Sequence, residues 1–251
     1  MGENSILKKF ISVLKSDGLL PSLTKSARYL LPDAISRRRK FRQVLELADT
    51  KARFEQIYAD NLWGDSGSRS GIGSNLSATE NLRNALPSLF ERYAIKTVLD
   101  VPCGDYYWMR HVIKVNPQIN YIGGDIVASM IAFNTEAFRA DNVSFALIDL
   151  TTDDLPDVDL LIVRDCMFHL SFDDIAKVKA NIKRSKIKYL LTTTHIVDKE
   201  FKNRDIVTSD FRLINIFTEP LSFKGAILER ITDHAPTEPP REMCLLEVAL
   251  I

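Results

Sequence analysis

The 251-residue sequence contains few of the residues that hold small secreted domains together. Its three cysteines, Cys103, Cys166 and Cys244, are odd in number and lie far apart. A disulfide framework therefore does not fit, and a reducing, cytoplasmic setting is expected. No apolar run approaches the roughly 18 residues of a membrane-spanning helix. The first residues also lack the long apolar core and small-residue cleavage site of a signal peptide, so we expect no secretion.

Histidine and glycine are also scarce, with four and ten residues respectively. The histidines lie far apart and show no His-x-x-x-His spacing, and there is no Cys-x-x-Cys pair, so we predict no metal site. The turn after the first expected strand contains only Gly104, and we expect a helix to begin near Asp105 directly after it. The single glycine excludes a Gly-x-Gly-x-x-Gly dinucleotide fingerprint there.

The chain has no formal net charge, because 33 basic side chains balance 33 acidic ones. The balance conceals an asymmetry, since residues 1–53 hold 12 Lys or Arg against 5 Asp or Glu. We expect residues 1–55 to form a basic helical N-terminal arm and residues 56–251 to form the main domain. The amphipathic start of the arm either lies on an anionic membrane surface or packs on the domain with its basic side in water.

Apolar spacing in the arm predicts helices near residues 6–14 and 23–31, and a longer one from the basic cluster at residues 37–40 to about Tyr58. The segment NLWGDSGSRSGIGSNLS, residues 61–77, is a loop rich in Gly and Ser. It is either a flexible linker or a loop whose backbone approaches a ligand closely, and Trp63 and Arg69 favour the second interpretation.

From Lys96 onward, short apolar runs alternate with helical stretches. The runs are Thr97–Val101, Tyr121–Asp125, Val143–Ile148, Asp159–Val163 and Tyr189–Thr193, and the helical stretches include residues 79–93, 128–140 and 173–185. This alternation predicts βαβ units with right-handed crossovers and a parallel sheet. The last two runs, Ala226–Thr232 and Cys244–Ile251, have no helix between them and predict an antiparallel hairpin.

Carboxylates stand at the ends of three successive expected strands, at Asp100, Asp125 and Asp149. Ligands of open α/β sheets bind at that edge. Asp100 would repel a pyrophosphate but attract an amine or a sulfonium. Asp125 can accept hydrogen bonds from both hydroxyls of a ribose, and Asp149 from an adenine amino group. The alternative is an acidic loop edge that serves solubility alone.

With these features the chain resembles a class I S-adenosylmethionine (SAM)-dependent methyltransferase over roughly residues 56–251. The turn DVPCGDYYW, the elements Trp63-Gly64 and Ser70–Ser74, and the stretch RDCMFHLS are similar to small methyltransferases of polysaccharide and capsule biosynthesis clusters. Pro102 and Tyr106 replace the first and third glycines of the family's usual motif. The resemblance implies an α/β Rossmann-like sheet of seven strands in the order 3-2-1-4-5-7-6, with its last strand pair antiparallel and an N-terminal helical extension.

The resemblance further implies S-adenosyl-L-methionine as the cofactor and a set of residues that bind it. The methionine part would contact Asp100 and the backbone of Pro102, Cys103 and Gly104. The ribose and adenine would contact Asp125, Ile126, Asp149 and Leu150. Trp63, Ser74 and Arg164 would lie near the methionine end and the transferable methyl.

Three residues are candidates for catalysis. His169, after the fourth strand, has a near-neutral ordinary pKa and can take a proton from an attacking hydroxyl. Asp165 is either the base itself or orients His169, and His195 faces the same crevice from the fifth strand. The structural alternatives are a histidine that is packed and bonded to backbone, and a simple pairing of Arg164 with Asp165.

The segment after the fifth strand lines the acceptor pocket in this family. Its candidate substrate-binding residues are Asn203, Asp205, Arg212 and Asn215. Arg212 would suit a phosphate or carboxylate on the substrate. Each of the four can instead be an ordinary polar surface residue.

The sequence as a whole predicts O-methylation of a sugar or phosphate-type acceptor in cell-surface polysaccharide biosynthesis. The expected partner is a small-molecule or glycan-linked acceptor rather than nucleic acid. The enzyme would be cytoplasmic, with contact between the arm and the inner membrane face left open. Two alternatives are an RNA methyltransferase that uses the basic arm and a non-catalytic SAM-binding scaffold.

Overall fold

The computed structural model describes residues 32–63, 67–236 and 238–251, and the chain divides between Glu46 and Leu47 into two compact units. The two helices expected near residues 6–14 and 23–31 lie outside the described residues. In the first unit, helix α3 (Pro32–Leu45) exposes the four basic side chains at positions 37–40.

The single long helix expected from residue 37 to about Tyr58 is wrong, because α3 ends at Leu45 and a second helix, α4, spans Thr50–Ala59. Asp49 explains the break. Its carboxylate accepts hydrogen bonds from the backbone N–H groups of Lys51 (3.3 Å) and Ala52 (3.0 Å), which caps α4 and starts a new helix. The expected domain boundary after residue 55 falls inside α4.

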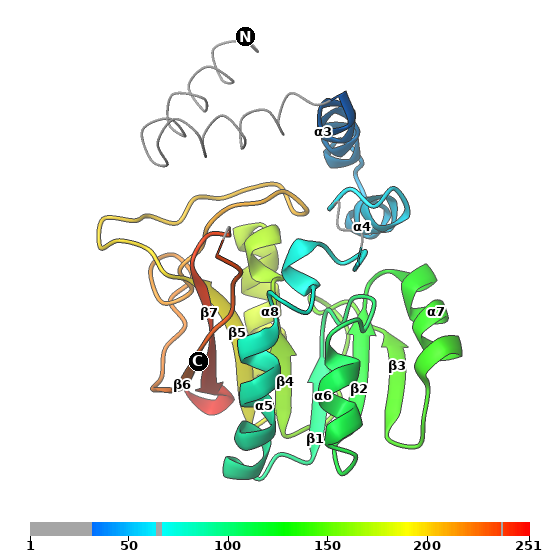
Figure 1. The fold of residues 1–251 in the computed structure, drawn as a ribbon. Coiled ribbons are helices and arrows are strands. Elements are labelled where there is room, and N and C mark those ends of the chain that lie inside the picture. Colours follow the sequence, from blue (N-terminus) through cyan, green and yellow to red (C-terminus); the bar gives the residue numbers. More distant parts are fainter. Residues whose placement is uncertain (1–31, 64–66, 237) are drawn as a thin grey trace. The chain divides into compact units, whose positions relative to one another are not determined.

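A seven-stranded mixed sheet forms the centre of the second unit (Figure 1). Its strands are β1 (Thr97–Asp100), β2 (Asn120–Asp125), β3 (Val143–Leu147), β4 (Leu160–Val163), β5 (Tyr189–His195), β6 (Ile227–Thr232) and β7 (Arg241–Glu247). They follow the order β3-β2-β1-β4-β5-β7-β6, with β1–β5 parallel and β7 antiparallel to both of its neighbours. The α/β fold class and strand order predicted from the sequence are confirmed. The last strand begins before the expected Cys244 and gives way to the short helix η3 (Val248–Leu250).

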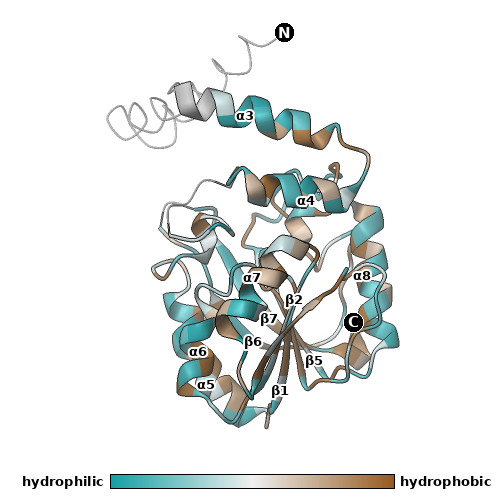
Figure 2. Ribbon diagram, turned by 90° about the vertical axis from the view of Figure 1, so that its right-hand side faces the viewer, coloured by the Kyte–Doolittle hydropathy of each residue, from teal (hydrophilic) through white to brown (hydrophobic). Residues whose placement is uncertain are grey.

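Apolar side chains cover both faces of the sheet, whose strands are the most hydrophobic part of the ribbon (Figure 2). Helices α5 (Glu80–Arg92) and α6 (Met109–Val115) pack on one face, and α8 (Phe172–Arg184) packs on the other. Helix α7 (Ala128–Phe138) contributes Phe138 to the layer of α5 and α6. Burial of this kind, at about 25 cal/mol per Å² of apolar surface, holds the strand ends in fixed positions.

Two departures from the usual alternation shape the carboxyl edge of the sheet. The helix expected to begin near Asp105 begins at Met109 instead, because Tyr106 has a φ of 56° and cannot continue a right-handed helix. Between β5 and β6 no helix forms. Residues 196–226 form an irregular segment instead, in which Ile214 is buried. The Ile214 carbonyl accepts a hydrogen bond from the backbone N–H of His195 (2.9 Å).

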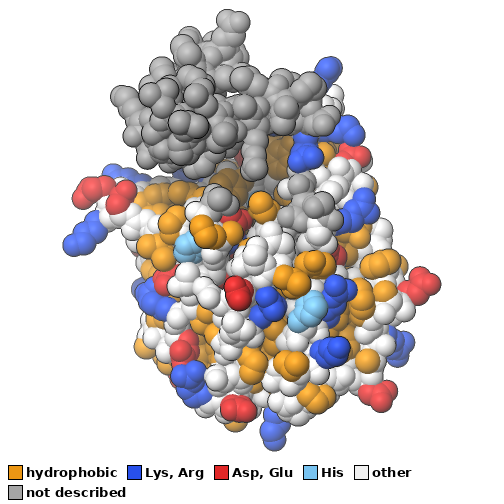
Figure 3. Space-filling model, viewed as in Figure 1, with side chains coloured by type: hydrophobic (Ala, Val, Ile, Leu, Met, Phe, Trp, Pro, Cys, Tyr) orange, Lys and Arg blue, Asp and Glu red, His pale blue; other side chains and the backbone are white. Residues whose placement is uncertain are grey.

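The visible face of the second unit carries Lys, Arg, Asp and Glu side chains interspersed with one another (Figure 3). Among the described residues, none of the helices has the length and apolarity needed to pass through a bilayer.

Candidate functional site

The turn after β1 is joined directly to the end of β2. The Gly104 N–H donates to one carboxylate oxygen of Asp125 (3.1 Å), and the Val127 N–H donates to the other (3.1 Å). The Cys103 N–H bonds the Gly124 carbonyl (2.8 Å). The structure therefore brings together the predicted methionine-binding turn, residues 100–104, and the predicted ribose carboxylate.

Asp100 and Asp125 are both buried, with 1% and 4% of their surface exposed. One Asp100 oxygen accepts from the Tyr121 hydroxyl (2.9 Å), but its Oδ1 has no partner among the described residues. Burial raises the pKa of Asp100 to about 7, against the opposing effects of the Tyr121 hydrogen bond and the Arg164 charge. Burial likewise raises the pKa of Asp125 to about 6. Two buried carboxylates without an ion-pair partner in the described chain are a place for a positive charge or a proton.

Gly104 and the loop at residues 67–75 fit closely together. Gly104 has a φ of +56°, and a Cβ there would lie 2.3 Å from the Ser70 hydroxyl oxygen, so only glycine is accommodated. Ser70 accepts from the Asp105 N–H (2.9 Å), and the Asp105 carboxylate contacts the Ser68 hydroxyl (3.0 Å) and the Arg69 N–H (2.9 Å). Because these hydrogen bonds hold the loop against the turn, the interpretation of the segment as a flexible linker does not fit.

The end of β3 is held by its own local hydrogen bonds. Asp149, two residues beyond the strand, accepts from the Thr151 N–H (2.8 Å) and hydroxyl (2.6 Å) through one oxygen. Leu150 is buried, and its carbonyl accepts from Asn181 (2.9 Å). At the end of β2, Ile126 is half-buried. These predicted adenine contacts lie at the same edge as Asp125, because β3 pairs with β2 in parallel.

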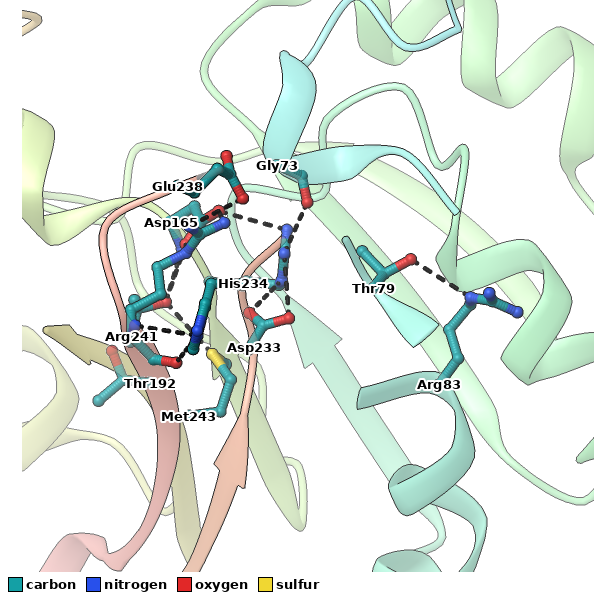
Figure 4. Close-up of polar contacts among 12 residues, drawn as sticks. Gly73, Thr79, Arg83, Asp165, Thr192, Asp233, His234, Glu238, Arg241 and Met243 are labelled. Carbon is teal, nitrogen blue, oxygen red and sulfur yellow. Dashed lines mark hydrogen bonds and ion pairs between the residues drawn. The ribbon is translucent and has the colours of Figure 1, made fainter. Parts of the chain in front are cut away.

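A buried ion network joins the loop at residues 71–74 to three strands (Figure 4). Arg164, after β4, donates to Asp233 through Nε (2.8 Å) and Nη2 (3.2 Å), and Nη2 also donates to the Gly73 carbonyl (2.7 Å). Ser74 ends the short helix η1 (Ile72–Ser74), which begins at this loop. Arg164 therefore positions the predicted methionine-end loop through its backbone, and Asp233 fixes Arg164.

Asp165 belongs to the same network. Arg241 holds it with Nε (3.0 Å) and Nη2 (3.0 Å) and also pairs with Glu238 (3.1 Å), while Arg164 Nη1 lies 3.5 Å from Asp165. Burial alone would raise the pKa of Asp165, but the two guanidinium charges keep it below its ordinary value. An ionised carboxylate shared by two arginines is a weak proton acceptor, so this geometry does not favour Asp165 as the base. The expected simple pair of Arg164 and Asp165 is only the longer contact, because Arg241 holds Asp165 more closely.

His169 is oriented by one backbone bond. Its Nδ1 lies 2.8 Å from the Asp210 carbonyl oxygen, so Nδ1 carries the proton and Nε2 keeps its lone pair. Burial lowers the pKa of His169, which keeps the ring neutral at physiological pH. The ring lies 5.9 Å from those of Trp63 and Phe211. From the sequence, a packed histidine bonded to backbone was the alternative to a catalytic base, and this backbone bond is present. The bond uses only Nδ1, so Nε2 is still able to accept a proton.

His195 has the opposite tautomer. Its Nδ1 accepts from the Ile214 N–H (3.2 Å), so Nε2 carries the proton. Burial and the charge of Arg241 lower its pKa to about 4. The His195 ring lies 5.2 Å from Phe168, which also contacts His169 at 4.5 Å. The structure therefore places a proton acceptor and a proton donor in contact with the same phenylalanine.

The four predicted substrate residues come together only in pairs, with Asn203 bonded to Asn215 and Asp205 within electrostatic range of Arg212. Asn203 donates to the Asn215 carbonyl (2.9 Å) and accepts from its N–H (2.9 Å), which closes the 203–215 loop. Asp205 accepts from the N–H of Phe172, where α8 begins (2.7 Å). Arg212 alone is fully buried beside the histidine cluster, with Nη1 donating to the carbonyl of Phe168 (3.3 Å).

Several residues of the site were not anticipated from the sequence. Asp105 follows Gly104 directly, so the turn motif already contained it, and the serines of SGSRSG offered matching hydroxyls. Nothing in the sequence near Asp233 indicated its role, because it lies 69 positions away from its partner Arg164. Glu55 of α4 was also missed, although it accepts from the Ala128 N–H (2.6 Å) at the start of α7.

Comparison with known proteins adds information on the fold. No family model matches the sequence, and no curated protein matches it. Magnesium protoporphyrin IX methyltransferase (ChlM) from Synechocystis PCC 6803 with bound SAH is similar at a TM-score of 0.54 and 10% identity, over 79% of this chain and 99% of that one. The methyltransferase domain of bacterial CtHen1 is similar at 0.52 and 12% identity, over 68% and 98%. At such identities the similarity concerns architecture, and the chain has the seven-stranded fold of class I methyltransferases.

Proposed function

We propose that the protein is a SAM-dependent methyltransferase. The observation that carries this proposal is the pair of buried carboxylates Asp100 and Asp125, one of them with an unpartnered oxygen, at the carboxyl ends of β1 and β2. S-adenosyl-L-methionine has an ammonium group, a sulfonium and a ribose diol, which match a buried acceptor-only site. The ChlM structures similar to this fold contain bound SAM or SAH.

The chain's own residues would divide the binding between them. Asp100 and the backbone of the 102–104 turn would hold the methionine end, Asp125 would accept from the ribose hydroxyls, and Asp149 would face the adenine edge. Bound SAM supplies an electrophilic methyl group on its sulfonium. Trp63 and the fastened 67–75 loop would exclude water and hold the reacting groups in line.

His169 is the general base of the proposed reaction. Its Nε2 lone pair would accept the proton of an acceptor hydroxyl, while the Asp210 carbonyl keeps Nδ1–H in place (2.8 Å). The Nε2–H of His195 can donate a hydrogen bond to the same acceptor. Asp165 remains ionised between two arginines and supports the site without exchanging a proton.

The acceptor we propose is a sugar or phosphate-type hydroxyl compound of cell-surface polysaccharide assembly. Support comes from the turn DVPCGDYYW and the RDCMFHLS stretch, which resemble the methyltransferases of such clusters, and from a neutral histidine base suited to a hydroxyl. Incubation with SAM and candidate nucleotide sugars, followed by release of S-adenosylhomocysteine, tests the acceptor class. If no sugar or sugar phosphate is methylated, this part of the proposal is wrong.

Cofactor binding is tested separately by isothermal titration calorimetry with SAM. Asp125→Asn should weaken SAM binding by roughly tenfold or more, because a charged acceptor shared by two hydroxyls is lost. Asp141→Asn, at an exposed carboxylate before β3, is the matched control and should leave the affinity unchanged. Equal affinity of the Asp125 variant and wild type, or binding of NAD in place of SAM, would contradict the assignment.

A further inference from the structure

Three arginines of the second unit are buried, each at 5% exposure or less: Arg164, Arg212 and Arg241. Arg164 grips Asp233 with the edge formed by Nε and Nη2, at 2.8 and 3.2 Å. Arg241 grips Asp165 with the same edge, at 3.0 Å for both nitrogens. The two parallel N–H groups of that edge match the two oxygens of a carboxylate or phosphate.

The same edge of Arg212 is empty. Its Nε and Nη2 are buried and have no hydrogen-bond partner among the described residues, and only Nη1 is used, in the bond to Phe168. The guanidinium lies over the Phe172 ring, at 5.4 Å. Asp205 is near enough for its charge to favour the cation, but one of its oxygens accepts from the N–H groups of Phe172 and Ile206, and it forms no ion pair with Arg212.

The Arg212 guanidinium stays protonated at neutral pH although burial lowers its pKa to about 10. A buried cation without a counter-charge is costly, and a bound anion is one arrangement that offsets the cost. The edge left empty here is the one that the other two buried arginines use for carboxylates. That edge of Arg212 therefore has the geometry to bind an oxyanion of the same shape.

Two more buried donors near His169 are unpartnered. The hydroxyl of Ser209 and the Nε1–H of Trp63 are buried and form no hydrogen bond within the described chain. Ser209 donates its backbone N–H to the His169 carbonyl (2.7 Å), and the Trp63 ring lies 5.9 Å from the His169 ring. Arg212 is close enough for its charge to lower the pKa of His169. Each of these three residues thus contacts His169 or lies within range of its charge, and each has an unpartnered donor among the described residues.

We propose that the Nε–Nη2 edge of Arg212, with Ser209 and Trp63, binds a carboxylate or phosphate group of the acceptor. The bound oxyanion directs a neighbouring hydroxyl of the same molecule toward Nε2 of His169. The acceptor is therefore an acidic sugar or a sugar phosphate, and a neutral sugar is a poor substrate. This inference rests on the proposed methyltransferase function, since it specifies the acceptor of that site.

The test is a binding titration that needs no turnover. In heteronuclear NMR spectra of the protein saturated with S-adenosylhomocysteine, the Arg212 Nε–H resonance is identified by its loss in Arg212→Lys. Inorganic phosphate, acetate and glucose are then added at constant ionic strength. We expect phosphate or acetate to shift this resonance in a saturable way, and glucose to leave it unchanged. The anion that binds with the higher affinity indicates whether the acceptor carries a phosphate or a carboxylate. No saturable shift with either anion would overturn the proposal.

Substitution separates a ligand site from a structural arginine. Arg212→Met should weaken binding of the preferred anion by roughly tenfold to a hundredfold, the loss of a charge-assisted bidentate contact. The matched control is Arg204→Met, an exposed arginine of the same segment, which should change it by less than about twofold. Because Arg212 has no internal counter-charge, Arg212→Met should also unfold at a higher urea concentration than wild type. A marked loss of stability, or unchanged anion affinity, would contradict the inference.

Failure of this inference is distinguishable from failure of the methyltransferase proposal. Calorimetry with S-adenosylhomocysteine comes first, and its affinity should be the same in wild type and Arg212→Met. If wild type does not bind it, the cofactor assignment is wrong. If wild type binds S-adenosylhomocysteine but neither anion shifts the Arg212 Nε–H resonance, only the proposed oxyanion site is contradicted. The methyltransferase proposal is then unaffected.

Discussion

At the scale of single residues, Asp100 links stability to pH. Its pKa of about 7 exceeds the ordinary 3.8, so the folded state takes up a proton that the unfolded state does not. Its contribution to stability is therefore greatest at low pH and is lost as the pH rises through about 7. Asp100→Asn, which removes the buried charge, should stabilise the protein at about pH 8, and this advantage should shrink by about 2 kcal/mol at about pH 5.5.

Urea unfolding of wild type and Asp100→Asn across this range measures the effect. Asp141→Asn is the control, and its difference from wild type should not vary in the same way, because Asp141 is exposed. A constant difference between Asp100→Asn and wild type at all pH values would show that Asp100 is already charged and compensated in the fold.

The two histidines of the site give a second residue-scale prediction. Burial lowers the pKa of both, to about 4 for His195, so each should stay neutral where a free histidine is protonated. Because the pKa values of both histidines are lower in the folded state, the unfolded chain takes up protons at a higher pH than the folded chain does. The free energy of unfolding therefore falls as the pH drops below about 6.5. NMR titration of the ring protons, with His169→Gln and His195→Gln for assignment, measures both. Titration of either ring above 6.5 would rule out the neutral tautomer pair.

The same residues show what a sequence can and cannot reveal. Asp100 and Asp125 were located because each ends a recognisable apolar run, and parallel strands bring such ends to one edge. The pairing of Asp165 was left open, because its partner Arg241 lies 76 positions away at the start of β7. The unpartnered edge of Arg212 depends on burial by residues distant in sequence, which no local pattern encodes.

At the scale of elements, residues 68–70 of the loop at 67–75 are held by one carboxylate, whereas Gly73 is held by Arg164. Asp105 receives hydrogen bonds from Ser68, Arg69 and Ser70 of this loop, and Arg69 is exposed. Asp105→Ala should release the loop, so cleavage by trypsin after Arg69 should become severalfold faster while the core of the unit stays folded. Mass spectrometry of timed digests measures the rate, with Asp141→Ala as the control. An unchanged rate would mean that other contacts hold the loop.

The ion network makes a contrasting element-scale prediction. Asp233 is fully buried and, directly after β6, holds Arg164 at the end of β4. Asp233→Asn should lower the free energy of unfolding by about 3 to 5 kcal/mol, because a buried guanidinium loses its counter-charge. The exposed pair of Lys186 and Asp157, at 3.2 Å, is the control, and Asp157→Asn should cost less than about 1 kcal/mol. Similar costs for both variants would contradict the importance of burial.

Elements were predicted more accurately than their ends. Periodicity located every strand of the sheet, most clearly where burial on both faces gives a continuous apolar run, as in β4. The break between α3 and α4 was missed, because only the cap made by Asp49 separates two stretches of similar polarity. The late start of α6 was missed for another reason. Tyr106 adopts a left-handed conformation, with its ring packed 5.0 Å from Tyr121, and tertiary packing of this kind overrides local preference.

At the scale of the whole molecule, the neutral net charge separates into a basic N-terminal unit and an acidic second unit. Among the described residues, those that form the apolar layers on both faces of the sheet belong to the second unit, 47–251. A fragment of residues 47–251 should therefore fold with nearly the thermal stability of the full chain and bind SAM with the same affinity. Calorimetry and thermal unfolding of the two proteins measure this, and loss of SAM binding by the fragment would show that the basic unit completes the site.

The same fragment tests what the basic excess is for. Contact between the basic unit and an anionic membrane surface, which the sequence left open, would gain about 1 kcal/mol for each Lys or Arg near the surface. The full chain should sediment with vesicles that contain phosphatidylserine and the fragment should not, and added salt should release the full chain. Neutral vesicles are the control. The full chain can instead fail to sediment with the vesicles and retard RNA in gel-shift assays, with binding that falls steeply as salt is added. That result would show that the basic unit binds nucleic acid and would support the RNA methyltransferase alternative.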